Sequence, residues 1–209
     1  MRSRSSARLR VLVTAGPTRE AIDPVRYLSN ESSGRMGFAI AAAAARAGHA
    51  TVLVAGPVEL PTPAGVRRVD VVSAREMLAA CRREFARCDA LFMAAAVADY
   101  RPRRQKRGKW RKAASRKGFA LLELVENPDI LRTLARRKGS RLVVGFALET
   151  GNGLERAKSK LVRKGADYIV LNGPASLGGA RTSAAILDRA GVVSRVRGAT
   201  KDALARRLV

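Results

Sequence analysis

"RLRVLVTA", residues Arg8 to Ala15, is an apolar run rich in β-branched side chains. A second such run, "ATVLVA" (Ala50–Ala55), follows it, and an alanine-rich segment that predicts a helix over Met36–Ala47 separates the two. Near-continuous apolar runs are typical of strands buried on both faces. A strand, a helix and a strand in this order form a right-handed crossover unit, so the two strands belong to a parallel sheet.

The rest of the chain continues this alternation. Ser73 with Glu76 predicts a capping box, and Asn127-Pro128 predicts an N-cap followed by proline at the first helical position. A short hairpin and a closing helix are expected over 183–209. Further strands are predicted at "VRRVDVV" (66–72), "ALFMAAA" (90–96), "RLVVGFA" (141–147) and "DYIVLN" (167–172). We expect an α/β fold: a single Rossmann-like three-layer domain over 1–209, with a mainly parallel sheet and helices on both faces.

Composition limits the function classes. The chain has 209 residues, 47% of them hydrophobic and only 4% aromatic, which favours a core of Ala, Val and Leu. No apolar run approaches the roughly 20 residues that span a bilayer, so we expect a cytoplasmic protein. Cys81 and Cys88 are expected near one face of one helix, as reduced thiols. His49 is the sole histidine, which leaves a histidine metal site or a Ser-His-Asp triad without its parts.

The formal net charge of +24 raises the question of nucleic-acid binding. Most of the excess is arginine spread along the whole chain. Arg101–Gly118, "RPRRQKRGKWRKAASRKG", differs because it contains no acidic residue. This segment is a solvated loop, a nucleic-acid arm, or a basic flap over a polyanionic small molecule.

"YLSNESSGRMGFAIAAAAARAGH" (Tyr27–His49) passes from polar turn chemistry directly into the alanine-rich helix. Ser and Asn there either cap the helix or leave its N–H groups free for an anion. A dinucleotide site is disfavoured, because Gly16 is followed by a long loop rather than G-x-G-x-x-G. A nucleoside triphosphate with an acidic second substrate suits both the helix front and the basic flap.

Several long motifs, in one order, carry a family resemblance. They are "VTAGPTREAIDPVRYLSNESSGRMGFAIA" (13–41), "AAAVADYRP" (94–102), "ENPDIL" (126–131), "VVGFALET" (143–150) and "AKSKLVRKGADYIVLN" (157–172). Together they resemble the bacterial phosphopantothenoylcysteine synthetase domain of coenzyme A biosynthesis. The resemblance implies a ligase that joins 4'-phosphopantothenate to L-cysteine through an acyl-cytidylate, using CTP and releasing CMP and pyrophosphate.

The resemblance also assigns residues. It makes Asn30 and Lys109 catalytic, Asn30 supporting conversion of the acyl-cytidylate and Lys109 its formation; if the alignment shifts, Lys106 or Lys112 takes the second role. The nucleotide-binding positions it implies are Gly16, Ser32, Gly34, Gly37, Met93, Ala94, Ala95, Asp99, Lys109, Pro128, Asp129, Ile130, Leu131, Phe146, Lys160 and Lys164. The phosphopantothenate-binding positions are Arg26, Asn30, Ala95, Ala96 and Asp99, with Arg26 reaching the neighbouring subunit of a homodimer.

Cofactors and partners follow from the same resemblance. Mg²⁺ is expected on the triphosphate of CTP, with no metal site of the protein's own. A flavin-dependent phosphopantothenoylcysteine decarboxylase, fused or separate, is an expected partner, and a membrane is not. The segment from Gly173 to Leu187 departs from the family pattern, which leaves contacts from that region open.

Two other functions compete with the ligase. A nucleic-acid-binding domain would use Arg101–Gly118 as a contact arm, but Trp110 alone offers little stacking surface and this function leaves Asn30 unexplained. An inactive relative kept as an interaction module is the other, and it is motivated by the altered stretch after Asn172.

Overall fold

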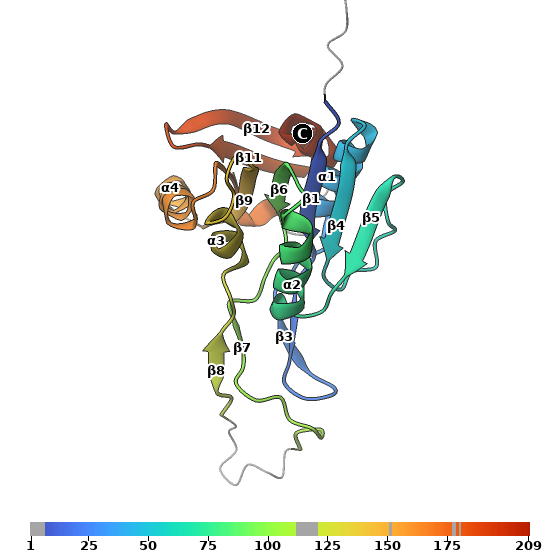
Figure 1. The fold of residues 1–209 in the computed structure, drawn as a ribbon. Coiled ribbons are helices and arrows are strands. Elements are labelled where there is room, and N and C mark those ends of the chain that lie inside the picture. The colour runs from blue at the N-terminus through green and yellow to red at the C-terminus, as the bar shows by residue number, and fades with distance from the viewer. Residues whose placement is uncertain (1–6, 112–120, 151, 177–178, 180) are drawn as a thin grey trace, which may run out of the picture.

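An eight-stranded sheet forms the middle layer of the protein, in the order β12-β11-β10-β9-β6-β1-β4-β5 (Figure 1). The computed structural model describes residues 7–111, 121–150, 152–176, 179 and 181–209. The neighbours from β10 to β5 are parallel, whereas β11 pairs antiparallel with both β10 and β12. The strands are β1 (Arg10–Ala15), β4 (Ala50–Ala55), β5 (Val66–Asp70), β6 (Ala90–Met93), β9 (Leu142–Leu148), β10 (Tyr168–Asn172), β11 (Arg181–Leu187) and β12 (Val192–Thr200).

Helices cover both faces of this sheet. Val11, Val13 and Ala15 of β1 pack into the core under α1 and α5, while Leu12 between them packs into the core on the opposite face. This alternation follows from the two-residue period of a strand. The helices are α1 (Arg35–Arg46) and α5 (Lys201–Leu208) on one face and α2 (Ala74–Phe85), α3 (Ile130–Ala135) and α4 (Gly153–Lys164) on the other. The predicted three-layer α/β fold is therefore confirmed; its extent as a single domain over 1–209 stays a prediction.

Small side chains bring α1 close to β1. A Cβ built on Gly37 would lie 2.5 Å from the Cβ of Ala15 and 2.7 Å from the main-chain oxygen of Thr14. Real Cβ atoms do not approach other atoms so closely, so only glycine allows this packing. The first turn of α1 is consequently held against the carboxyl end of β1.

Two short antiparallel strand pairs extend from this same end of the sheet (Figure 1). One pairs β2 (Arg19–Ala21) with β3 (Tyr27–Ser29), and the other pairs β7 (Tyr100–Pro102) with β8 (Leu124–Glu126). The predicted basic flap, 101–118, begins in β7. Its described part ends at Arg111, and its remainder, with Lys112, lies outside the described residues.

Local details confirm some expectations and correct others. Ser73 caps α2, and its hydroxyl accepts a hydrogen bond from the N–H of Glu76 at 3.2 Å. The predicted N-cap at Asn127 is wrong: Asp129 caps α3, because the side chain of Asn127 is engaged by the neighbouring loop. The predicted C-terminal hairpin and closing helix are β11, β12 and α5.

The two cysteines are free, as expected, and both are buried. Cys81 lies in α2, but Cys88 lies beyond the end of that helix, so the expectation that one helix carries both is wrong. Burial raises the pKa of the Cys81 thiol to about 12 and that of the Cys88 thiol to about 11. Thiols with such pKa values are inert structural residues.

Among the described residues, we find no helix with both the length and the apolar character that crossing a membrane requires.

Candidate active site at the carboxyl end of the sheet

Two adjoining cavities open at the carboxyl ends of β1, β6, β9 and β10. One has a volume of about 530 Å³ and the other about 670 Å³. They share five lining residues, Ala95, Val97, Asp99, Phe146 and Lys160, so they adjoin along a common wall. Ligands of open α/β sheets bind at this end of the strands, because loops there diverge to opposite faces.

The site gathers the predicted residues from distant parts of the chain. The smaller cavity is lined by the predicted residues Asn30, Ser32, Gly34, Gly37, Ala94 and Ala96, in addition to the shared wall. The larger cavity adds the predicted residues Met93, Pro128, Asp129, Ile130, Leu131 and Lys164. Three predicted residues line neither cavity: Gly16, Arg26 and Lys109.

The N-terminus of α1 forms one wall of the smaller cavity. Its N-cap is Gly34, which adopts the left-handed conformation at φ 72°, and no side chain caps the helix. Ser32 accepts a hydrogen bond from the N–H of Gly34 at 3.4 Å, but it covers none of the first-turn N–H groups. Free N–H groups and the helix dipole favour a bound anion. Of the two roles considered for this stretch, the geometry favours the anion site over side-chain capping.

Gly16 supports this wall from behind. Its φ is +76°, and a Cβ there would lie 3.1 Å from the main-chain oxygen of Gly56. Its own oxygen accepts a hydrogen bond from the N–H of Ala96 at 2.9 Å. Gly16 therefore joins the end of β1 to the loop after β6, rather than lining the cavity.

Buried threonines fix the loop 94–99. The N–H of Ala95 donates to the hydroxyl of Thr14 at 3.2 Å, and the N–H of Ala98 donates to the hydroxyl of Thr18 at 3.0 Å. Both threonines have 0% exposed surface. Sequence reasoning missed both; for Thr14, a polar residue inside the apolar run of β1 was the available signal.

Two asparagines complete the support of this loop. The amide of Asn30 donates to the main-chain oxygens of Ala96 and Val97, at 3.3 and 3.1 Å. From the opposite side, the amide of Asn127 donates to the oxygen of Ala98 at 2.9 Å. These bonds consume the N–H donors of Asn30, so its side-chain oxygen is the group left to meet a ligand.

Two cations of α4 lie at the cavities: Lys160 lines the wall that both share, and Lys164 lines the larger one. The Nζ of Lys160 donates to the main-chain oxygen of Phe146 at 2.7 Å. Burial, together with the positive charge of Lys164, lowers the pKa of Lys160. One turn away, Lys164 forms an ion pair with Asp129. Burial acts to raise the pKa of Asp129, but the hydrogen bonds from Lys164 and from the N–H of Arg132 outweigh it and lower that pKa.

Further polar residues of the smaller cavity were missed by the sequence analysis. Arg35 and Lys201 bring two more cations to it, and burial with the charge of Arg35 lowers the pKa of Lys201. Asn172, at the end of β10, has a buried Oδ1 with no hydrogen-bond partner among the described residues. Arg35 and Lys201 thus add donors for an anionic ligand, whereas the Oδ1 of Asn172 is an acceptor.

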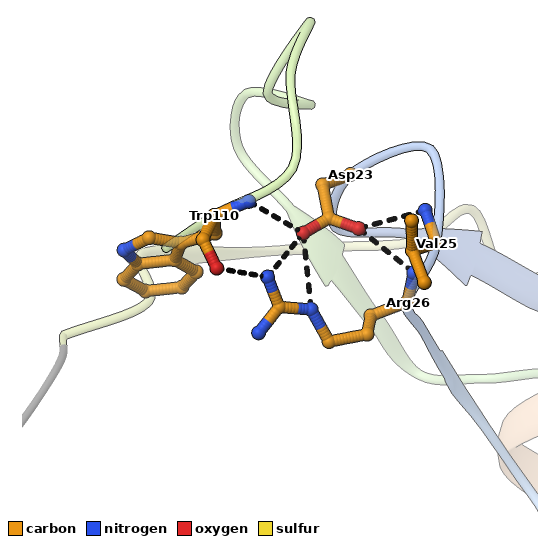
Figure 2. A network of polar contacts seen from close by, with 4 residues as sticks. All are labelled: Asp23, Val25, Arg26 and Trp110. Atoms are coloured by element: carbon orange, nitrogen blue, oxygen red, sulfur yellow. Dashed lines mark hydrogen bonds and ion pairs between the residues drawn. The ribbon is translucent and has the colours of Figure 1, made fainter. Parts of the chain in front are cut away.

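Arg26 and Lys109 lie on the two projecting segments. Arg26 follows the loop after β2, where its guanidinium pairs with Asp23 and donates to the main-chain oxygen of Trp110 (Figure 2). Lys109 is exposed and precedes Trp110 in the described part of the basic flap. The structure therefore brings these two residues near each other, outside the cavities.

Comparison with known proteins decides the family. The model of the DNA/pantothenate metabolism flavoprotein C-terminal domain matches residues 6–209. The chain belongs to this family. The Coenzyme A biosynthesis bifunctional protein CoaBC of Escherichia coli strain K12 is 50% identical over 165 residues, which cover 78% of this chain and 41% of that protein. The chain thus spans about two fifths of the length of such curated relatives.

Two solved structures have the same fold as this chain. The C-terminal domain of a Coenzyme A biosynthesis bifunctional protein CoaBC is 39% identical, with a TM-score of 0.82 over 96% of this chain and 91% of that chain. A Cab2 mutant in complex with phosphopantothenate-cysteine is 17% identical, with a TM-score of 0.81 over 96% of this chain and 84% of that chain. The second likeness shows the fold alone.

Metal ligands do not gather at this site. Within the described ranges, no group of three or more His, Cys, Asp or Glu side chains is arranged to hold a metal ion. Of the carboxylates at the larger cavity, Asp129 is paired with Lys164.

Proposed function

We propose that this chain is the phosphopantothenate–cysteine ligase of its family: with CTP it activates 4'-phosphopantothenate as an acyl-cytidylate and transfers the acyl group to L-cysteine. The observation that carries the proposal is the cavity at which an uncapped helix N-terminus, Asn30 and Lys160 meet. The similarity to coenzyme A biosynthesis proteins supports the choice of substrates.

Nucleotide binding uses both cavities. The triphosphate lies at the N-terminus of α1, where first-turn N–H groups and the cations Arg35 and Lys201 offset its charge. The nucleoside lies toward Phe146, Lys160 and the α3 segment. Mg²⁺, bound by the phosphates, supplies further neutralisation of their charge.

The proposed reaction has two steps. First, a carboxylate oxygen of phosphopantothenate attacks the α-phosphorus of CTP, a P–O bond forms, and pyrophosphate leaves with the electrons of the broken P–O bond. Second, the amine of cysteine attacks the acyl carbon, CMP leaves, and the amine loses a proton. Both steps bring anions or developing charge together, so fixed cations and N–H donors lower the barrier.

Asn30 and Lys109 serve different steps in this proposal. Lys109 stabilises charge on the phosphates during the first step. Asn30 acts in the second step: its N–H donors are bound to the loop 94–99, while its oxygen remains to accept a hydrogen bond from the cysteine amine. The proposed assembly is a homodimer in which Arg26 reaches phosphopantothenate in the neighbouring subunit.

The test is pyrophosphate release with Mg²⁺ and 4'-phosphopantothenate, comparing CTP with ATP, each with and without L-cysteine. We expect release that requires phosphopantothenate and favours CTP. Without cysteine it should stop after about one turnover, and with cysteine it should continue. Absence of nucleotide consumption by folded protein contradicts the proposal, and salt-dependent binding to nucleic acid is then the next measurement.

A further inference from the structure

Asp23 is a buried carboxylate that accepts hydrogen bonds from two separate segments (Figure 2). Its Oδ1 accepts from the N–H groups of Val25 and Arg26, both at 2.8 Å. Its Oδ2 accepts from Nε of Arg26 and from the N–H of Trp110, both at 3.0 Å, and pairs with Nη2 of Arg26. Asp23 is only 2% exposed, so these donors replace the water that an exposed carboxylate would have.

The two oxygens of Asp23 serve different purposes. Oδ1 closes the turn of its own loop, an arrangement that an asparagine side chain also makes. Oδ2 is surrounded by donors of Arg26 and Trp110, and only a carboxylate offers an acceptor there. Closing the local turn therefore does not explain why this position is an acid.

A second set of contacts joins the same segments. The N–H of Lys106 donates to the main-chain oxygen of Ile22 at 2.9 Å. The Nζ of Lys106 lies 3.8 Å from the centre of the Trp110 ring, within cation–π range. The described part of the flap is thus fixed to the loop after β2 at both Lys106 and Trp110.

These segments carry the two residues to which the proposed function assigns catalysis. The loop leads into β3, which ends at Ser29, immediately before Asn30. On the flap, Lys109 immediately precedes Trp110. From this juxtaposition we infer that Asp23 is a positioning residue of the ligase: through Arg26 and Trp110 it holds Lys109 of the flap in register with the hairpin that carries Asn30. The inference rests on the proposed function, because it assigns Lys109 its catalytic role.

The variant D23N separates positioning from local folding. It keeps an oxygen for the turn but replaces Oδ2 with an NH₂ group that faces three donors. Trp110 is the only tryptophan of the chain, so its fluorescence reports directly on this contact. We expect emission at longer wavelength and stronger acrylamide quenching in D23N, because the indole leaves Lys106 and enters water. D167N is the matched control, since Asp167 also joins a backbone N–H, that of Val143, to a cation, Lys138.

The kinetic readout is the rate of phosphopantothenate-dependent pyrophosphate release without cysteine. Displacement of a catalytic group by about 1 Å can cost on the order of 10²-fold. We expect a loss of that order in D23N, an affinity for CTP that changes far less, and a normal rate in D167N. The burst, which is the single-turnover release of pyrophosphate without cysteine, is measured first in the wild type. Its absence would contradict the proposed function itself.

A second pair of variants tests the inference independently, in case D23N misfolds. W110P removes the N–H that donates to Asp23, whereas W110F retains it; both lose the indole. We expect the burst in W110P to be much slower than in W110F, with equal melting temperatures. The inference is overturned if D23N moves Trp110 but leaves the burst rate unchanged, or if W110P and W110F release pyrophosphate equally fast. If D23N lacks the circular dichroism spectrum of the native fold, the comparison of W110P with W110F tests the inference.

Discussion

The Nζ of Lys160 donates a hydrogen bond to the main-chain oxygen of Phe146, so α4 holds a cation at the carboxyl end of β9. This pair lies on the wall that the two cavities share. A half-buried cation that spends one donor on a carbonyl still offers two N–H groups to a ligand. An anion that binds there recovers part of the solvation which Lys160 loses on folding.

The pH dependence of CTP binding follows from Lys160. Burial and the charge of Lys164 lower its pKa, so Lys160 loses its proton at a lower pH than an ordinary lysine. The affinity for CTP should therefore fall as the pH rises through this lowered pKa. Titration calorimetry between about pH 7 and about pH 10 measures it. K160M should bind CTP about tenfold more weakly or worse at neutral pH, since charged hydrogen bonds contribute about 1.5–3 kcal/mol, and its affinity should vary less with pH.

The same substitution should not destabilise the fold. Because the pKa of Lys160 is lower in the folded state, the unfolded chain binds more protons, and this residue makes stability rise with pH in that range. K160M removes a half-buried charge, so its melting temperature should equal or exceed that of the wild type. K158M, a change at an exposed position of α4, is the control for both measurements. A lower melting temperature in K160M alone would show that the lysine stabilises the domain.

Asn30→Asp should uncouple the two steps of the proposed reaction. A carboxylate there faces the oxygens of Ala96 and Val97, to which the amide now donates, and it repels them. We expect N30D to release one equivalent of pyrophosphate and to accumulate acyl-cytidylate, while amide formation falls by about 10²-fold or more. Mass spectrometry of quenched reactions detects the intermediate. Normal amide formation in N30D would remove Asn30 from the second step.

Gly37→Ala should displace the first turn of α1. The added Cβ would lie 2.5 Å from the Cβ of Ala15, so the helix must shift or the strand must yield. Overpacking of this kind costs about 1–3 kcal/mol, and here it also moves N–H groups at the cavity. The free energy of unfolding, measured by urea denaturation, and the affinity for CTP should both fall. In G173A, where a Cβ has open space, neither should change, and equal effects in the two variants would contradict the packing argument.

The fold was predictable because its signals are local. Apolar runs such as Val11–Ala15 and helix starts such as Ser73 depend on neighbouring residues, and the structure confirms both. Asn127 failed as an N-cap because its side chain bonds to Ala98, 29 residues earlier in the chain. No local sequence pattern predicts a partner at that separation. Tertiary contacts of this kind override the propensity of asparagine to cap a helix.

The site was predictable only as far as motifs mark it. Residues of the glycine-rich helix front and the loop 94–99 line the cavity system, as the family resemblance implied. Lys201 was missed because α5 follows a hairpin with no motif, yet the fold brings it to the N-terminus of α1. Asp23 was missed because a lone acid in a loop looks like solvated surface until its donors are known.

Thr18→Val tests whether the loop 94–99 must be held rigid for activity. The hydroxyl of Thr18 accepts the N–H of Ala98 at 3.0 Å in a fully buried position, and valine keeps the shape but leaves that N–H without a partner. An unsatisfied buried donor costs about 1–3 kcal/mol, so T18V should melt at a lower temperature. Asn30 also donates a hydrogen bond to this loop. We therefore expect kcat/KM for phosphopantothenate to fall by more than the loss of stability accounts for. T18S retains the hydroxyl and should restore most of the activity; if T18S and T18V lose equal activity, the methyl group rather than the hydrogen bond is what the loop requires.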